Sequence, residues 1–374
     1  MVGDIMTRHV LFIIDGLPGG GAENVTLTLA SGIADRGFQV TLLSLSTRLD
    51  YEIPHNITYR VCQDEPSGPF RKLTELARRA RALDTELNQL FEDKGKPSLV
   101  ISSLHKTDRI VVRSKVLADC HVWHCIHGIY SRSYLGNKKY ISRWLKKLKI
   151  QQTYYKRNVI TVSDAVGDDL INVVGIKPRK IVTIYNPFDF SSIRERAQAT
   201  NPFEGEEYIL HIGRLHQVKR QDRLLEAFAQ ANIPTRLIIV GQGEPTVTEQ
   251  IKATINRLNL QERVTLTGFT HNPLPILKGA RLFALSSDSE GLPTVLIESL
   301  ICGTPIVSTA CPGGVAEIMT GKLAPYQSEL NSVSLAEKLS LCWQSPPEIT
   351  SEMYAKFDIN LIIERYLSLM VKQD

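Results

Sequence analysis

Two carboxylates, Glu290 and Glu298, stand eight residues apart in a stretch of Ser, Gly, Pro and apolar residues. Glu290 lies in a Gly/Pro loop after the apolar residues 280–285, and Glu298 falls inside the apolar run that follows the loop. This order predicts a strand, a loop and a helix. Glu290 then belongs at the strand's carboxyl end and Glu298 about two turns into the helix, so both can face one crevice. A carboxylate there can bind a pair of hydroxyls by accepting two hydrogen bonds. The alternative is an ordinary turn and helix with two exposed acids.

Two cations, Arg214 and Lys219, stand five residues apart after the apolar, strand-like residues 208–212. Across a loop they can converge on a diphosphate, and two fixed cations also stabilise the charge that builds on a departing nucleoside diphosphate. The alternative is a solvated basic loop. We favour the functional interpretation because Glu290 is predicted in the same kind of loop.

Several loops after strand-like runs are rich in glycine. Gly20 and Gly21 open a helix-like run, where glycine lets the backbone approach a ligand and the helix start favours anions. Their spacing is not the G-x-G-x-x-G of dinucleotide-binding proteins, which speaks against a nicotinamide cofactor. Later turns carry Gly241, Gly243 and Gly268. Tight turns that serve packing alone are the alternative at each position.

A cluster of histidines at residues 121–127 suggests a metal site, which we reject. Alternation along a strand sends His124 and His127 to opposite faces, and the spacing fits no zinc site. The sequence has no convincing D-x-D motif for a divalent cation either, so we predict no metal cofactor, with Arg214 and Lys219 in its place. It also has no nucleophile elbow and no P-loop. His124 is expected to be buried scaffold.

A basic and aromatic segment covers residues 138–157, which hold eight Lys and Arg and no acid. Apolar residues recur there at helical spacing and basic residues lie between them: Ile141, Trp144, Leu145 and Leu148, with Lys138, Lys139, Arg143, Lys146, Lys147 and Lys149. Such a helix could lie on an anionic membrane surface, where each basic residue adds about 1 kcal/mol. The alternative is a helix that packs its apolar stripe on a sheet and solvates its basic face. A nucleic-acid partner is disfavoured.

These residues need strands and helices that alternate. In the first half, apolar runs predict strands at residues 9–15, 38–45, 57–62, 98–103, 121–127, 158–163 and 181–185, with long helices at 22–36 and 71–91. The polar residues 190–202 are predicted to be a linker. A second cycle has strands predicted at residues 208–212, 237–240, 264–266, 281–285 and 305–308. The expected fold class is α/β, with two doubly wound Rossmann-like domains, residues 1–190 and 191–357, facing a cleft.

Length and composition limit the class of protein to which this chain can belong. The 374 residues, 43% hydrophobic and 22% charged, are typical of a globular protein of two domains. No apolar run approaches the roughly 18 residues that cross a bilayer, and the first run is too short for a signal peptide, so we expect a cytoplasmic protein. Six scattered cysteines indicate reduced thiols. Residues 1–190 hold 27 basic and 19 acidic side chains, a net charge of +8, and the remainder holds 17 and 20, a net −3. The asymmetry predicts different partners for the two halves.

Together these motifs resemble glycosyltransferase family 4, whose members are retaining, nucleotide-sugar-dependent enzymes of the GT-B fold. The likeness spans nearly the whole chain and is most specific from residue 208 to 317. The spacing of Glu290 and Glu298 is similar to the family's E-x7-E signature, residues 213–219 to its G-R-L-x-x-x-K stretch, and residues 20–23 to its G-G-x-E loop. The fold also implies that the last helix, within residues 358–374, crosses back to the first domain.

The resemblance implies a role for each matching residue. Glu298 would hold the ribose hydroxyls, Arg214 and Lys219 the diphosphate, and Glu290 the sugar hydroxyls. His127, at a strand's carboxyl end, would contact the donor sugar beside the reacting carbon. Further donor-binding positions are expected at Gly20, Gly21, Gly213, Gly241, Gly243, Gly268, Phe269, Gly291, Leu292 and Pro293.

The expected reaction transfers a hexose or N-acetylhexosamine from a UDP-sugar to a lipid-linked or lipopolysaccharide-core glycan. The enzyme would retain the anomeric configuration, need no metal, and be peripheral on the inner face of the cell membrane. The basic first domain would bind the acceptor. Three alternatives stay open: a sugar-nucleotide epimerase of the same fold, a nicotinamide-dependent oxidoreductase, and a non-enzymatic scaffold that binds membrane or nucleic acid.

Overall fold

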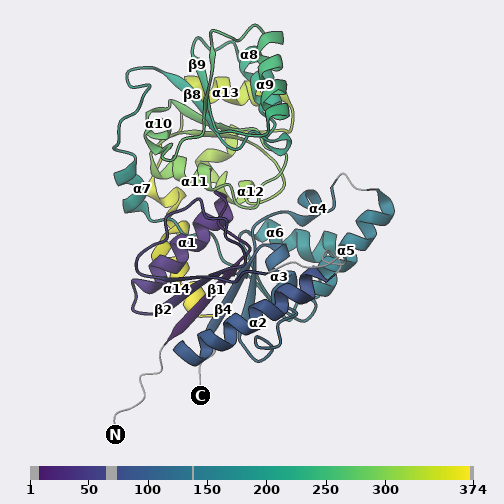
Figure 1. The fold of residues 1–374 in the computed structure, drawn as a ribbon. Helices are drawn as coiled ribbons and strands as arrows, with labels where there is room; N and C mark the ends of the chain where they lie inside the picture. Colours follow the sequence, from purple (N-terminus) through teal and green to yellow (C-terminus); the bar gives the residue numbers. More distant parts are fainter. Residues whose placement is uncertain (1–7, 65–73, 137–138, 371–374) are drawn as a thin grey trace. The chain divides into compact units, whose positions relative to one another are not determined.

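The computed structural model describes residues 8–64, 74–136 and 139–370. The chain divides into two compact units. One holds the residues up to Pro187 together with those from Ile359 onward, and the other holds Phe188 to Asp358. Each unit is built on a parallel β-sheet with helices between its strands (Figure 1). The predicted pair of doubly wound α/β domains is confirmed.

The sheet of the first unit has seven strands in the order β3-β2-β1-β4-β5-β6-β7, paired in parallel throughout. These strands are β1 (His9–Ile14), β2 (Gln39–Ser44), β3 (Thr58–Val61), β4 (Leu99–Ser103), β5 (Val122–Ile126), β6 (Asn158–Thr161) and β7 (Lys180–Thr183). Its helices are α1 (Gly21–Ala34), α2 (Glu75–Lys94), α3 (His105–Val111), α4 (Tyr130–Ser133), α5 (Tyr140–Tyr154), α6 (Asp164–Asp168), a π-helical turn (Asp169–Val174) and α14 (Ile359–Leu367). The strand order reverses between β1 and β4, which is the point where open α/β sheets bind ligands.

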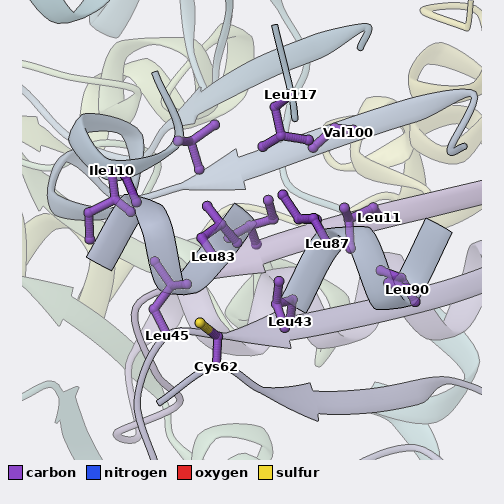
Figure 2. Packing of buried hydrophobic residues seen from close by; sticks show 13 residues of the cluster. Leu11, Leu43, Leu45, Cys62, Leu83, Leu87, Leu90, Val100, Ile110 and Leu117 are labelled. Carbon is purple, nitrogen blue, oxygen red and sulfur yellow. The ribbon is translucent and has the colours of Figure 1, made fainter. Parts of the chain in front are cut away.

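Leucines of α2 hold this long helix on the first sheet. Leu83, Leu87 and Leu90 recur at intervals of four and three residues, so they share one face of the helix. Figure 2 shows them beside Leu11 of β1 and Leu43 of β2 in one buried cluster. The strands β1 and β2 are almost wholly buried, as expected for a parallel sheet that helices cover on both faces. This core fixes the strand ends from which the loops begin.

The chain returns to the first unit in α14. Gly32 of α1 permits close helix packing, because a side chain there would lie 2.6 Å from Ile363 Cδ1. Arg36 forms an ion pair with Glu364 and donates to Asn360 Oδ1 at 2.9 Å. The last helix therefore belongs to the first unit, as the two-unit division also has it.

The sheet of the second unit has six strands in the order β10-β9-β8-β11-β12-β13. They are β8 (Tyr208–Ile212), β9 (Arg236–Val240), β10 (Val264–Gly268), β11 (Leu282–Leu285), β12 (Ile306–Thr309) and the short β13 (Gln327–Ser328), which the sequence did not predict. The α-helices are α7 (Phe190–Arg196), α8 (Gln221–Ala231), α9 (Pro245–Arg257), α10 (Leu274–Gly279), α11 (Thr294–Ile301), α12 (Val315–Ile318) and α13 (Ser332–Gln344). Short 3₁₀ turns lie at Gln217–Lys219, Gly321–Tyr326, Ser351–Met353 and Ala355–Phe357. Again the order reverses, here between β8 and β11.

The prediction of a linker over residues 190–202 is wrong, because α7 occupies the first half of that range. Asp189 caps this helix by accepting a backbone N–H three residues further on at 3.0 Å. The Phe190 ring meets Tyr354 edge-on, with 5.0 Å between centroids. Because Tyr354 lies more than 160 residues further along the chain, the polar sequence around Phe190 did not indicate a packed helix.

Candidate active site

Lys219 and Glu290, predicted from separate motifs, are in direct contact in the second unit. The Lys219 ammonium donates to Glu290 Oε1 at 2.6 Å, and the two side chains are 24% and 11% exposed. Ser287 donates to the same oxygen at 2.5 Å. Because an ammonium has three N–H donors, Lys219 can hold Glu290 and still donate to a ligand. The pair forms a fixed polar surface after the carboxyl ends of β8 and β11.

Hydrogen bonds join the two loops that carry this pair. Ser286 donates to Lys219 O at 2.8 Å, and the backbone N–H of Asp288 donates to Val218 O at 2.8 Å. Arg223 of α8 donates to Ser286 O at 2.8 Å and to Asp288 Oδ1 at 2.5 Å. Asp288 therefore anchors the Glu290 loop to α8. Together the two loops fix the distance between the Lys219 ammonium and the Glu290 carboxylate.

Gly313 allows the backbone after β12 to approach Glu290. Its φ is +124°, and a side chain at this position would lie 1.5 Å from the Glu290 carbonyl oxygen. Glu290 N donates to Pro312 O at 3.0 Å, and Gly314 N donates to Gly291 O at 2.8 Å. Residues 312–314 thus hold the Glu290 loop by its main chain.

Leu292 and Pro293, two predicted donor-binding positions, have buried side chains. Pro293 also lacks an N–H and stands directly before α11. Any contribution of Leu292 to a site is therefore through its backbone amide. The role of Pro293 in the structure is to begin the helix that carries Glu298.

Glu298 lies in α11 as predicted, but it is the fifth residue of the helix. The expected depth of two turns is wrong, since five residues make little more than one turn. Its half-buried carboxylate has no hydrogen-bond partner among the described residues. Burial raises the pKa of Glu298, and Arg196 opposes the rise.

Arg214 is exposed and forms no ion pair within the described ranges, and the Phe269 ring is 56% exposed. These side chains are available to a ligand.

The glycines of two other turns are required by backbone packing. A side chain on Gly241 would lie 2.1 Å from Gly213 O, and one on Gly243 would lie 2.1 Å from Leu215 O. Gly241 N also donates to Gly268 O at 2.8 Å. Close approach of neighbouring strand ends accounts for these two glycines without a ligand, so their part in donor binding stays a prediction.

Gly20 and Gly21 lie in the first unit, where β1 leads into α1. Gly20 is the N-cap residue, and its carbonyl accepts a hydrogen bond from Tyr51 at 2.9 Å. A side chain on Gly20 would lie 2.2 Å from Glu23 Oε2, whereas one on Gly21 would meet open space. Local packing accounts for Gly20, and Gly21 leaves the helix start open.

His127 directly follows β5 in the first unit. Its Nε2 atom is buried and has no hydrogen-bond partner in the described structure. Burial lowers the pKa of His127 to about 4, and Asp108 opposes this, so the ring is neutral near pH 7. A buried ring nitrogen without a partner is a suitable contact for a ligand hydroxyl. His124 is 1% exposed, which confirms its expected place in the core.

Asp108 of α3 centres a polar network that the sequence analysis missed. Its fully buried carboxylate accepts from Ser102 at 2.5 Å, from His124 Nδ1 at 3.1 Å and from Tyr154 at 2.7 Å. The Tyr154 hydroxyl also meets that of Tyr130 at 3.1 Å, and burial raises the pKa of both tyrosines well above the usual value. The partners come from β4, β5 and α5, so no local pattern could have revealed the network.

The first two turns of α5 expose a large apolar surface. Tyr140, Ile141, Trp144 and Leu145 are 85%, 72%, 54% and 46% exposed. Burial in α5 is confined to its second half, at Ile150, Thr153 and Tyr154. The interpretation that this helix packs its whole apolar stripe on the sheet is therefore wrong.

Basic side chains accompany this apolar surface. Lys139, Arg143 and Lys149 are exposed, Lys146 is half-buried, and Lys147 donates to Val173 O at 2.9 Å. Lys138, also predicted for this patch, lies outside the described residues. In the part of the chain that the structure describes, no helix has the length and apolar character of a membrane span.

Two family models match consecutive parts of the chain. The model described as Glycosyltransferase Family 4 matches residues 19–192, and the one described as Glycosyl transferases group 1 matches residues 192–354. Together they cover Gly20, Lys219, Glu290 and Glu298.

Two curated relatives carry names that state their reaction or pathway. The N-acetylgalactosamine-N,N'-diacetylbacillosaminyl-diphospho-undecaprenol 4-alpha-N-acetylgalactosaminyltransferase of Campylobacter jejuni is 28% identical over 315 residues, which is 84% of this chain and 83% of that protein. The amylovoran biosynthesis glycosyltransferase AmsD of Erwinia amylovora is 25% identical over 364 residues, which is 93% of this chain and 97% of that protein.

Solved structures share the fold of this chain. The crystal structure of Anabaena Alr3699/HepE in complex with UDP-glucose is 22% identical, has a TM-score of 0.73, and covers 96% of this chain and 98% of its own. At this identity the likeness establishes the fold, and the family models establish the membership. The chain belongs to glycosyltransferase family 4 and is a glycosyltransferase of the GT-B fold.

Proposed function

We propose that the protein transfers a hexose or N-acetylhexosamine from a UDP-sugar to a lipid-linked or lipopolysaccharide-core glycan, with retention and without a metal. The observation that carries this proposal is the contact of Lys219 with Glu290 after two neighbouring strand ends. A sugar diphosphate would need a cation and a carboxylate close together, and this pair offers both. UDP-bound neighbours of the same fold support the choice of nucleotide.

In this proposal the second unit binds the donor. Glu298, whose carboxylate has no partner among the described residues, accepts the ribose hydroxyls. Arg214 and Lys219 bind the diphosphate and stabilise the charge that develops as it leaves. Glu290 accepts hydrogen bonds from sugar hydroxyls, and Ser287 holds it in place. The family resemblance also gives a sugar contact to His127, whose Nε2 has no hydrogen-bond partner in the described structure.

Retention needs no protein nucleophile in this mechanism. The bond from the anomeric carbon to the departing phosphate oxygen breaks, and the acceptor hydroxyl bonds to that carbon from the same face. Its proton passes to the departing phosphate oxygen of UDP. The side chains then supply position and charge stabilisation rather than covalent chemistry.

The first unit binds the acceptor at a membrane surface. The apolar face and basic residues of α5 would lie on the anionic cytoplasmic face of the inner membrane, where a lipid-linked substrate is found. Exposed Ile141 and Trp144 provide apolar area, and Lys139 and Arg143 provide charge. The Campylobacter jejuni relative, whose name gives an undecaprenol-linked acceptor, supports this class of substrate.

Calorimetry and thermal unfolding with UDP, GDP, ADP and their sugars test the donor assignment. At 100 times its dissociation constant, a ligand adds about 2.7 kcal/mol of stability. UDP compounds should stabilise the wild type and lose this effect in Glu298→Ala. Glu249→Ala, which alters an exposed glutamate of α9, is the matched control. Equal responses of the two variants, or no response to any nucleotide, would refute the donor site. Turnover of a UDP-sugar without an acceptor, to an epimer, would replace transfer by epimerisation.

A further inference from the structure

The first unit contains a cavity of about 610 Å³ at the carboxyl ends of β1 to β4. This volume lies within the roughly 300–1,000 Å³ usual for small-molecule sites. It spans the switch point between β1 and β4, where parallel α/β sheets bind their ligands. Its described lining residues all belong to the first unit, and none of them is a predicted donor-binding position, although Glu23 is close in sequence to Gly20 and Gly21.

Most of the charged side chains that line this cavity neutralise one another. Arg79 donates to Asp15 at 2.5 Å and lies 3.6 Å from Glu75. Lys106 lies 3.5 Å from Asp15 and 3.6 Å from Glu75, so these four side chains form a closed ring of ion pairs. Arg78 is in turn paired with Asp64. Among the described residues, the lining holds four cations and four carboxylates: Arg48, Arg78, Arg79 and Lys106, with Asp15, Glu23, Asp64 and Glu75.

A phosphate or diphosphate would fit poorly here. An anion needs cations that are not already paired, and Arg48 is the one lining cation without an ion pair among the described residues. The four carboxylates of the described lining offset its four cations, so it offers an anion no net electrostatic attraction. An uncharged sugar has the opposite requirement, since its hydroxyls both donate to carboxylates and accept from ammonium and guanidinium groups. Pro18, Leu45 and Leu104 add apolar surface for its C–H faces.

Leu104 shows that the backbone at this edge is held in an unusual conformation. Its φ is +78° although it is not glycine. Leu104 lies between β4 and α3, which begins at His105. Such a conformation is sterically unfavourable and persists where the surroundings require it. Here it directs the start of α3, and with it Lys106, to the ring around Asp15.

We infer that this cavity binds an uncharged terminal sugar of the acceptor glycan, with Glu75 and Lys106 as the residues that select it. The inference rests on the proposed function and deepens it by giving the chemistry of the acceptor. Glu75 and Lys106 are 40% and 52% exposed, so they can turn from each other to sugar hydroxyls at little cost. Arg79, 9% exposed, keeps Asp15 in place. The anionic part of a lipid-linked acceptor then lies outside the cavity.

Ligand-observed NMR with neutral sugars tests this inference on the full chain. The probes are methyl glycosides of glucose, galactose, N-acetylglucosamine and N-acetylgalactosamine, with inorganic pyrophosphate as the anionic probe. The variants are Glu75→Gln and Lys106→Met, which keep size and remove charge. Glu92→Gln, on the exposed side of the same helix, and Lys115→Met are the matched controls. UDP binding is measured on all five proteins by calorimetry.

At least one glycoside should bind the wild type, and its dissociation constant should rise about tenfold in Glu75→Gln and Lys106→Met. Neither control should change it, and UDP affinity should be the same in all proteins. Equal glycoside binding in all variants would overturn the inference, as would UDP binding with no glycoside binding. Pyrophosphate binding that Lys106→Met abolishes would also overturn it. If UDP does not bind but the cavity variants still weaken a glycoside, the proposed function fails and the sugar site stands.

Discussion

Lys219 donates to Glu290 at 2.6 Å, so two residues with different expected roles already partly neutralise each other. The ammonium that is to meet a diphosphate is oriented by the carboxylate that is to meet the sugar. Ser287 adds a second hydrogen bond to the same carboxylate oxygen. The site is therefore preorganised by its own polar groups, which reduces the reorganisation needed as charge develops.

Replacing Lys219 with alanine should lower kcat by about 100- to 1,000-fold, the usual effect of removing one preorganised donor from a developing negative charge. Because the pair is partly exposed, stability should change by no more than about 1 kcal/mol. Steady-state kinetics with a UDP-sugar and thermal unfolding measure the two effects. Lys252→Ala, which breaks an exposed pair with Glu249 at 2.9 Å, is the control and should leave both unchanged.

The coupling itself can be measured with a double-mutant cycle on Lys219→Ala and Glu290→Gln. Since the residues are in contact, the loss in the double variant should be smaller than the product of the single losses. If the loss of activity in the double variant equals the product of the single losses, the two side chains act independently. The interpretation of Lys219 and Glu290 as a preorganised pair would then be wrong.

Gly313→Ala should be strongly destabilising and should abolish activity. Its added side chain would overlap the Glu290 carbonyl oxygen at 1.5 Å, so the Glu290 loop would have to move. Gly303→Ala is the matched control, because Gly303 also has a positive φ, +81°, but has open space around it. We expect the control to lose about 1–2 kcal/mol from backbone strain and to keep its kcat. Similar melting temperatures and similar kcat values for the two variants would show that the close approach has no role.

The sequence predicted elements with strong local patterns and failed where packing is long-range. The strand of residues 208–212 and the helix predicted at residues 22–36 were found because apolar periodicity and Gly punctuation are local. The helix α7 was taken for a linker because the Tyr354 ring that it packs against lies far along the chain. Turn residues also place the start of a helix only to within a few positions, which is why the sequence predicts Glu298 about two turns into α11 although it is the fifth residue of that helix.

The candidate site divides in the same way. Lys219 and Glu290 were named from spacing within loops, but their contact depends on the register of β8 with β11, which no local pattern gives. Asp108 was missed for the same reason, since its three partners come from other elements. The ring of Asp15, Arg79, Glu75 and Lys106 forms only where the end of β1 meets the first turns of α2 and α3.

Membrane binding should depend on the first turns of α5. Ile141→Ala with Trp144→Ala removes exposed apolar area, and Arg143→Glu with Lys146→Glu reverses charge. Each basic residue contributes about 1 kcal/mol near an anionic surface, so the charge variant should bind vesicles containing phosphatidylglycerol at least about tenfold more weakly. Vesicle flotation measures this, with phosphatidylcholine vesicles as the neutral comparison.

Two control variants distinguish vesicle binding by α5 from nonspecific binding by other exposed side chains. Val333→Ala removes an apolar side chain that is 60% exposed in the second unit, and Lys115→Glu reverses an exposed charge elsewhere in the first. Neither should alter flotation, and added salt should weaken the wild type. Unchanged flotation of both α5 variants would remove the support for a membrane surface at this helix.

His211 should make the stability of the second unit depend on pH. It is fully buried, its Nδ1 meets the Ala284 carbonyl at 2.9 Å, and Gln221 approaches its Nε2 at 3.3 Å. Burial lowers the pKa of His211 to about 4, the Ala284 carbonyl and Glu290 oppose this, and Lys219 adds to it. The ordinary pKa is about 6.5, so between pH 6.5 and 4 the unfolded state binds more protons than the folded state.

The stability that neutral His211 contributes is therefore complete above pH 6.5 and is lost as the pH falls towards 4, up to about 3 kcal/mol. His211→Gln should be less stable than the wild type at pH 7, and the difference in free energy of unfolding should shrink as the pH falls. Urea unfolding at a series of pH values measures it, with the exposed His271→Gln as the control in the same unit. Other buried histidines act on both proteins alike and cancel in the difference. Parallel curves for the wild type and His211→Gln would mean that folding leaves the pKa of this ring unchanged.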